Sequence, residues 1–408
     1  MNLTWRLAWR NLWRHRRRTW LTVSAMVVCN VLLIFLIGLQ LGSYDVMIEG
    51  SLGPVTGHLQ VQREGFQEDQ RIRDSVPGAT ALARTLRRAL PEAEVGVRGT
   101  AFALASSEAR SFGIQLQGVE AAREPGVSTL PGMLAEGRYL RGEGEEIVVG
   151  RLLARNLQAQ PGDEVVLLGS GRDGSMAAAV ARLVGVVDSG IAELDRALAQ
   201  VDLAWFQSVF AMGDHAHALV LRLPHLEAVP AAKARVQSLL PPDSELVVLD
   251  WDQLQPGLRQ AIRTDMVSAW FLYGVLVLLV AFSVLNTQLM SVLERTREFG
   301  VMLALGLGPG RLARLVAMET ALLGGLGLVL GILFGTVLTL ALARWGFTYP
   351  GMEEVAQQFN LPARLYPRPG AAALLVGPGV VFAGALLAAL YPALRLYRLQ
   401  PVAAMRAV

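Results

Sequence analysis

The sequence predicts an α-helical membrane protein with four transmembrane helices, one plus three, and a large α+β extracytoplasmic domain inserted between the first and second. Two observations support this fold class. First, the 408-residue chain is 53% hydrophobic and only 17% charged, whereas a soluble domain carries about 25% charged residues. Second, long runs without charge alternate with short basic patches, which is typical of membrane proteins. The net charge of +3 does not favour nucleic-acid binding.

Four apolar runs are long enough to cross a bilayer, which needs roughly 20 residues in a helix. We expect the transmembrane helices at residues 20–41, 267–292, 315–343 and 371–394. None has a charge near its middle, and Glu319 lies near the start of the third, close to the interface. The first run is too long for a signal peptide and lacks a small-residue cleavage site, so we interpret it as a retained anchor.

The arginines predict the orientation, because cytoplasmic flanks are enriched in basic residues. Arginines gather before the first run, between the second and third, and after the fourth. Both termini, including the tail 395–408, and the 293–314 segment are therefore expected in the cytoplasm. The 42–266 segment and the short 344–370 loop are expected outside. Residues 1–19 combine tryptophan and leucine with arginine, which favours a cytoplasmic amphipathic helix on the membrane surface; a plain basic flank is the simpler alternative.

The external segment mixes short β-like and helical patterns. We expect strands at residues 58–62, 94–105, 112–118, 146–149, 164–168, 182–187, 218–223 and 246–249. We expect helices at residues 80–90, 151–157, 199–210 and 227–240. Linkers are expected at residues 42–57 and 249–265.

The sequence lacks the residues that two common energy sources need, namely ATP hydrolysis and a proton relay. A phosphate-binding P-loop needs a lysine after its glycines, and the single lysine, Lys233, follows Val-Pro-Ala-Ala. No acidic or histidine residue lies in the middle of a predicted span, so a proton relay is not expected either. Energy would therefore come from a partner.

Catalytic and metal chemistry are not expected. His215, His217 and His225 lack a cysteine partner and have loop-like spacing, so ordinary surface or core roles are favoured over a metal site. Cys29 is the only cysteine and lies in an apolar run, which favours a packing role. No Gly-x-Ser-x-Gly elbow is present, and no substrate-binding residues can be named.

The most informative stretch follows the second apolar run. Residues 294–306 read Glu-Arg-Thr-Arg-Glu-Phe-Gly-Val-Met-Leu-Ala-Leu-Gly, and further glycines and a proline follow at 308–310. The pattern is dense in charge, then amphipathic, then broken, which fits a short surface helix. Such a helix could enter a groove on a soluble partner; a solvated loop is the alternative.

This stretch resembles the coupling-helix motif of type VII ABC transporter permeases, which include the macrolide-exporter (MacB), lipoprotein-releasing (LolC and LolE) and cell-division (FtsX) permeases. The order of further similar segments matches across nearly the whole chain. They are residues 10–14 before the first run, residues 137–140, 146–150 and 161–165 in the external segment, and residues 391–393 and 400–406 at the C-terminus. Residues 58–61 and 186–190 look most like the lipoprotein-releasing branch.

The resemblance implies a permease subunit with no cofactor of its own, paired with separate ABC ATPase subunits that bind ATP and Mg²⁺. It also implies a second permease subunit, identical or related, contact with membrane lipid, a possible periplasmic carrier or adaptor protein, and a bacterial inner-membrane location. ATP hydrolysis would drive mechanotransmission to the periplasmic domain, with lipoprotein or another outer-leaflet substrate extracted or exported. The alternative is a non-transport signalling subunit that activates a periplasmic cell-wall hydrolase.

The same resemblance implies that the ATPase contact is made by residues 294–306. The expected coupling residues are Glu294, Arg295, Arg297, Glu298, Phe299, Gly300, Met302, Leu303, Leu305 and Gly306. Within this set, Phe299, Met302 and Leu303 share one helical face and are expected to enter the ATPase groove, with charged residues at its rim.

Overall fold

The computed structural model describes residues 3–242, 244–348, 350–352, 364–368, 370–399 and 404. They form two compact units. The helical unit takes its residues from Met1–Asp45, Ile262–Pro350 and Ala363–Val408, and the sheet unit takes its residues mainly from Val46–Ala261.

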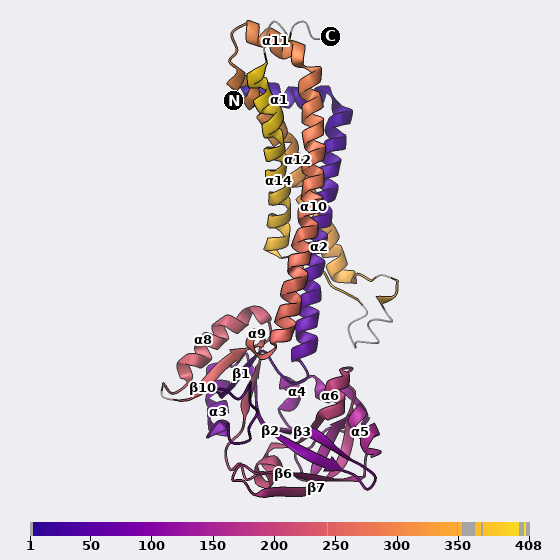
Figure 1. Cartoon of the computed structure of the whole chain (residues 1–408), viewed down its shortest axis with the longest axis vertical. Helices are drawn as coiled ribbons and strands as arrows, with labels where there is room; N and C mark the ends of the chain where they lie inside the picture. The colour runs from indigo at the N-terminus through magenta and orange to yellow at the C-terminus, as the bar shows by residue number, and fades with distance from the viewer. Residues whose placement is uncertain are drawn as a thin grey trace. The chain divides into compact units, whose positions relative to one another are not determined.

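Helices make up almost all of the helical unit (Figure 1). In chain order they are α1 (Leu3–Arg14), α2 (Arg16–Leu52), α10 (Pro256–Glu294), α11 (Thr296–Ala304), α12 (Pro309–Trp345) and α14 (Ala371–Arg395), followed by the 3-10 turn η3 (Leu396–Arg398). In the described part of the chain, four helices are long and apolar enough to cross a membrane, namely α2, α10, α12 and α14. Each contains one of the four predicted apolar runs.

Helix packing in this unit relies on small side chains at one contact. Along α12, glycines face α2 at four-residue intervals, so they lie on one side of the helix. A Cβ atom on Gly331 would lie 2.4 Å from Cβ of Asn30, and one on Gly335 would lie 2.7 Å from Ile34. Only glycine permits this approach, as is common between membrane helices. Large apolar side chains such as Phe271 and Phe282 are exposed on other faces, as expected for surfaces that meet lipid.

The sheet unit contains one ten-stranded mixed sheet. Its strands are β1 (Leu59–Arg63), β2 (Glu94–Ser106), β3 (Ser111–Val119), β4 (Leu134–Gly137), β5 (Glu146–Gly150), β6 (Glu164–Ser170), β7 (Met176–Val187), β8 (Leu198–Asp202), β9 (Ala218–Arg222) and β10 (Leu246–Asp250). Their order is β10-β1-β9-β2-β3-β8-β5-β7-β4, and β6 pairs with β2 and β7.

Short helices complete this unit, and those longer than one turn are α3 (Ala79–Ala89), α5 (Arg151–Leu157), α6 (Ala192–Ala197), α7 (Leu203–Val209) and α8 (Val229–Leu239). The side chains of β1, β2 and β9 that point to one side form an apolar core with α3 and α8, exemplified by Val61, Val97 and Leu219. A second core joins α5 and α7 to β3, β5 and β7. The opposite face of β1, β9, β2 and β3 carries the alternate, mainly polar, residues.

Several sequence predictions for this unit are confirmed and others are wrong. Each of the eight predicted strands overlaps an observed strand, and the predicted helix 151–157 is α5. The predicted helix 199–210 is wrong over its first residues, which form the buried strand β8; only Leu203–Val209 is helical. The predicted linkers are also wrong, because α2 continues to Leu52 and α10 begins at Pro256. About half of the predicted external loop 344–370 lies outside the described residues. The C-terminal residues 400–406 lie outside them except for residue 404.

Candidate coupling site

The candidate site is the short helix α11, which interrupts the path from α10 to α12. Arg295 leaves the helical conformation (φ −101°, ψ 12°) and so separates α10 from α11. At the other end Gly306 adopts a left-handed conformation (φ 91°), which favours glycine. Pro309 then starts α12, because proline is well tolerated in the first turn of a helix. The sequence therefore encodes a separate short helix with a defined start and end.

A buried ion pair joins this corner to α12. Nη1 of Arg295 donates to both carboxylate oxygens of Glu319, at 3.0 and 3.1 Å. Their side chains are only 11% and 8% exposed. Glu319 also accepts a hydrogen bond of 2.7 Å from the amide of Asn11 in α1, and the Arg295 guanidinium lies 4.9 Å from the centre of the Phe299 ring. A buried charge is tolerated only when paired in this way.

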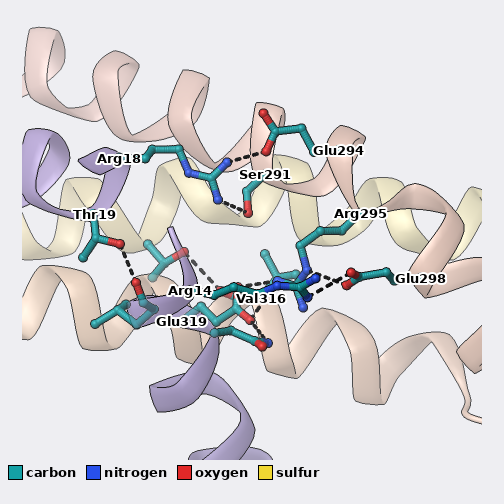
Figure 2. A network of polar contacts seen from close by, with 12 residues as sticks. Arg14, Arg18, Thr19, Ser291, Glu294, Arg295, Glu298, Val316 and Glu319 are labelled. Carbon is teal, nitrogen blue, oxygen red and sulfur yellow. Dashed lines mark hydrogen bonds and ion pairs between the residues drawn. The ribbon is translucent and has the colours of Figure 1, made fainter. Parts of the chain in front are cut away.

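More exposed ion pairs connect the N-terminal helices to the same corner (Figure 2). Arg14 contacts Glu298 at 3.0 Å, while Arg18 contacts Glu294 at 2.8 Å and also donates to Ser291. Partial burial alone would raise the pKa of Glu298, but hydrogen bonds from Arg295 and Arg14 lower the pKa of this carboxyl below its ordinary value. α1 and the start of α2 are thus tied to both ends of the α10–α11 turn.

In the structure, the apolar face of α11 that was expected to enter an ATPase groove packs within the chain itself. Phe299 is fully buried, and it packs with Val292, Leu312, Val316 and Leu396 of the same chain. Met302 and Leu303 are half-buried against the same cluster, and Gly300 and Arg295 are also buried. The face predicted to enter a partner's groove therefore anchors α11 to its own bundle, because a short helix needs its apolar side covered to be stable.

The exposed side of α11 is formed by other residues. Arg297 is exposed, Val301 is 44% exposed and Leu305 is 80% exposed. Their four-residue spacing places them on one face. Glu294 and the glycines 306 and 308 are exposed next to it, while Glu298 is half-buried by its ion pairs. We name Arg297, Val301 and Leu305 the outer stripe.

Sequence reasoning missed the internal network of Asn11, Arg14, Arg18 and Glu319. One signal pointed to it: Glu319 is the only acidic residue in the third apolar run. A carboxylate in such a segment needs a partner, and an arginine lay just before the run. The arginine that pairs with Glu319 is set by the turn at residue 295, and the hydrophobic pattern of the sequence does not predict this turn.

The three histidines of the sheet unit have roles in local packing and turns. His217 is buried, its Nδ1 accepts from the Thr100 amide at 2.9 Å and its Nε2 lies 3.1 Å from the Ile72 carbonyl. His215 contacts Ser75 through Nδ1, and His225 is the N-cap residue of a short 3-10 turn, with no capping hydrogen bond from its side chain. Among the described residues, no group of three or more His, Cys, Asp or Glu side chains has a geometry suited to a metal ion.

Four apolar helices with an α+β domain inserted after the first define an integral membrane protein of one-plus-three arrangement. Comparison with known families agrees over most of the chain. Residues 19–239 match the MacB-like periplasmic core domain, and residues 270–401 match the FtsX-like permease C-terminal domain. The chain belongs to the family of type VII ABC transporter permeases with a MacB-like periplasmic core and an FtsX-like C-terminal domain, and it is a multi-pass protein of the bacterial inner membrane.

Similar proteins include lipoprotein-releasing permeases. The lipoprotein-releasing system transmembrane protein LolC of Xylella fastidiosa is 27% identical over 71% of this chain and 72% of that protein. LolC of Neisseria meningitidis is 23% identical over 58% of each chain. The periplasmic region of MacB from Actinobacillus actinomycetemcomitans, a solved structure, is 14% identical with a TM-score of 0.37, covering 52% of this chain and 98% of that one.

Proposed function

We propose that this chain is the non-catalytic permease subunit of an ABC transporter that receives the energy of ATP hydrolysis from a separate ATPase subunit through α11. The observation that carries the proposal is the outer stripe. The inner face of α11 is fixed to the bundle by Phe299 and the Arg295–Glu319 pair, while the stripe leaves two large apolar side chains and an arginine uncovered. Short helices that present such a face are suited to a groove on a partner.

The internal network supports transmission beyond α11. A force on α11 acts on α12 through Arg295 and Glu319, and on α1 and α2 through Arg14 and Arg18. Because a buried ion pair resists separation more strongly than an exposed one, we expect α11 and the start of α12 to move together. Mechanotransmission to the periplasmic domain is the role this arrangement supports.

Lipoprotein release is the transport activity we favour over signalling to a cell-wall hydrolase. The supporting observation is the similarity to LolC proteins over most of the chain. In this proposal a second permease subunit completes the membrane complex, a periplasmic carrier or adaptor accepts the substrate, and ATP and Mg²⁺ bind only to the ATPase. Purified alone, the chain should not bind ATP; stoichiometric binding would contradict the permease role.

Introducing negative charge on the outer stripe tests the coupling proposal. Arg297→Glu and Leu305→Asp should abolish ATPase stimulation and lower affinity for the ATPase by about 2 kcal/mol or more if these side chains are central contacts. Arg235→Glu, an exposed arginine on α8, is the matched control and should leave coupling unchanged. Normal ATPase binding and stimulation in both stripe variants would show that α11 is not the contact.

Phe299→Ala is not a suitable probe of the ATPase contact. Phe299 is buried in its own chain, so its truncation should destabilise the α11 corner by roughly 3–5 kcal/mol. Loss of coupling in this variant would report the local fold.

The proposed orientation has its own test. Reporter fusions at Asp69 and Ala232 should report an external location, and fusions at Gly308 and Val408 a cytoplasmic one. An external signal at Gly308 would exclude contact between α11 and a cytoplasmic ATPase.

A further inference from the structure

A polar cavity lies in the sheet unit, on the face of β1, β9, β2 and β3 opposite α3 and α8. Its volume is about 190 Å³. The floor is formed by alternate residues of four strands, among them Gln62 on β1, Thr100 on β2, Gln117 on β3 and Val220 on β9. Parts of the segments 55–56, 66–70 and 254–255 line the rest of it. On the order of ten waters would fill this space, so it is too large to be a packing defect.

Two residues that line this cavity each have a buried polar atom without a hydrogen-bond partner among the described residues. The two atoms are Oε1 of Gln62 and Nε of Arg98, in side chains of residues that are 1% and 3% exposed. A buried acceptor or donor without a partner lowers stability, so native proteins rarely retain one without a reason. Both residues line the same cavity, so a small adjustment of either side chain would bring its polar atom to a molecule bound there.

Neighbouring contacts hold the Arg98 and Gln117 side chains in place, and they leave little net charge at the cavity wall. Two of the three Arg98 nitrogens are engaged, one by the Glu124 carboxylate and one by the Val55 carbonyl. Arg98 therefore offers its Nε–H as a donor while its charge is balanced by a buried partner. Gln117 is held in a similar way: its oxygen accepts from Gln200 at 3.3 Å, which directs its NH₂ group elsewhere.

These features define the chemistry of a ligand. Carboxylates and thiols are absent from the cavity lining, so a metal ion is not expected. The one cation is paired, which disfavours a strongly anionic ligand. The wall offers an acceptor at Gln62 and donors at Arg98 and Gln117, on three strands. Hydroxyl groups both donate and accept, so a molecule with several hydroxyls can satisfy all three, whereas a single carboxamide reaches fewer. Phe66 adds an apolar wall.

We propose that this cavity is a binding site for a neutral, polyhydroxylated molecule of about one sugar ring in size. The volume is below the roughly 300 Å³ of pockets for drug-sized ligands, which agrees with a single ring. The ring could be a free monosaccharide or the head group of a glycolipid. This site is independent of α11 and of the proposed coupling.

The test uses the full chain in lipid nanodiscs, because glycoside detergents would compete for the site. Glucose, N-acetylglucosamine and glycerol are added as probes, followed by saturation-transfer NMR and by hydrogen exchange of residues 60–70. We expect saturation transfer to at least one sugar and slower exchange of this segment. Comparison of free sugar with nanodiscs containing a glycolipid of the same head group distinguishes the two sources.

Gln62→Leu is the decisive variant. Because it removes an unsatisfied buried amide and keeps its approximate size, the ligand-free protein should exchange as slowly as the parent or more slowly. Affinity for the sugar should nevertheless fall at least tenfold, about 1.4 kcal/mol. Thr100→Val, a smaller change on the same floor, should also weaken binding, and Gln237→Leu on the exposed side of α8 should not.

Three outcomes would overturn the proposal. The first is no response to any sugar or polyol, which would mean that the cavity holds only water. The second is unchanged affinity in both Gln62→Leu and Thr100→Val. The third is stronger binding of a carboxamide, such as a capped glutamine, than of every sugar.

Discussion

Breaking the buried pair between Arg295 and Glu319 should destabilise the helical unit more than any exposed ion pair does. Removal of one partner from a buried pair typically costs 3–5 kcal/mol. Arg295→Met leaves Glu319 with only the hydrogen bond from Asn11, so we expect about 3 kcal/mol. Glu319→Leu leaves Arg295 with the half-exposed Glu298 at 3.3 Å, so we expect about 2 kcal/mol. The double variant leaves no buried charge unpaired and should cost about 2 kcal/mol, which gives a coupling energy of about 3 kcal/mol.

The single cysteine provides the assay. Cys29 is buried in the core shared by α2, α10 and α14, so its reaction with a thiol-specific dye reports opening of the bundle during a detergent or thermal titration. Arg14→Met is the matched control, because the Arg14–Glu298 side chains are 61% and 41% exposed and such pairs contribute less than about 1 kcal/mol. Additive effects of Arg295→Met and Glu319→Leu within about 0.5 kcal/mol would refute a coupled buried pair.

Two further predictions concern acid stability and helix packing. Burial lowers the pKa of His217 from its ordinary value near 6.5 to about 4, so this side chain is neutral in the folded state. The free energy of unfolding should therefore be constant above pH 6.5 and fall by roughly 3 kcal/mol as the pH drops to 4. Hydrogen exchange of β9 should report this loss, and His217→Gln should reduce it. On α12, Gly331→Ala places a Cβ 2.4 Å from Asn30 and should speed the labelling of Cys29. Gly325→Ala is the control, because the space around Gly325 is open, and it should be neutral or stabilising by up to about 1 kcal/mol. Equal labelling rates in the two variants would argue against close packing of α2 on α12.

The sequence was a good guide where one physical signal dominates. Long apolar runs identified the four helices, and alternation identified strands such as 94–105. It failed at residues 199–202, because the alternation of Ala-Gln-Val-Asp is only four residues long and runs directly into the helical pattern of residues 203–209. These residues form the buried strand β8, which pairs with β3 and β5. It also failed at the C-terminal end of α2 and the N-terminal end of α10, because each helix extends beyond its apolar run into polar sequence.

At the candidate site, the amphipathic pattern of residues 296–304 predicted a helix but not what its apolar face contacts. Phe299, Met302 and Leu303 share a face, as expected, yet the same chain supplies the groove. Hydrophobic periodicity predicts that one face of a helix is covered. Whether a partner or the chain itself covers it depends on distant contacts, such as that of Phe299 with Leu396, nearly a hundred residues along the chain.

The glycine contact between α2 and α12 restricts how these helices can move. Side chains of α2 at four-residue spacing lie in successive recesses over the glycines of α12; they are Met26 over Gly327, Asn30 over Gly331 and Ile34 over Gly335. Four residues advance a helix by about 6 Å. Sliding would have to lift each side chain over the flank of its recess, and the next matching position lies about 6 Å away. The pair therefore has discrete registers, and small continuous displacements must be accommodated at other contacts of the bundle.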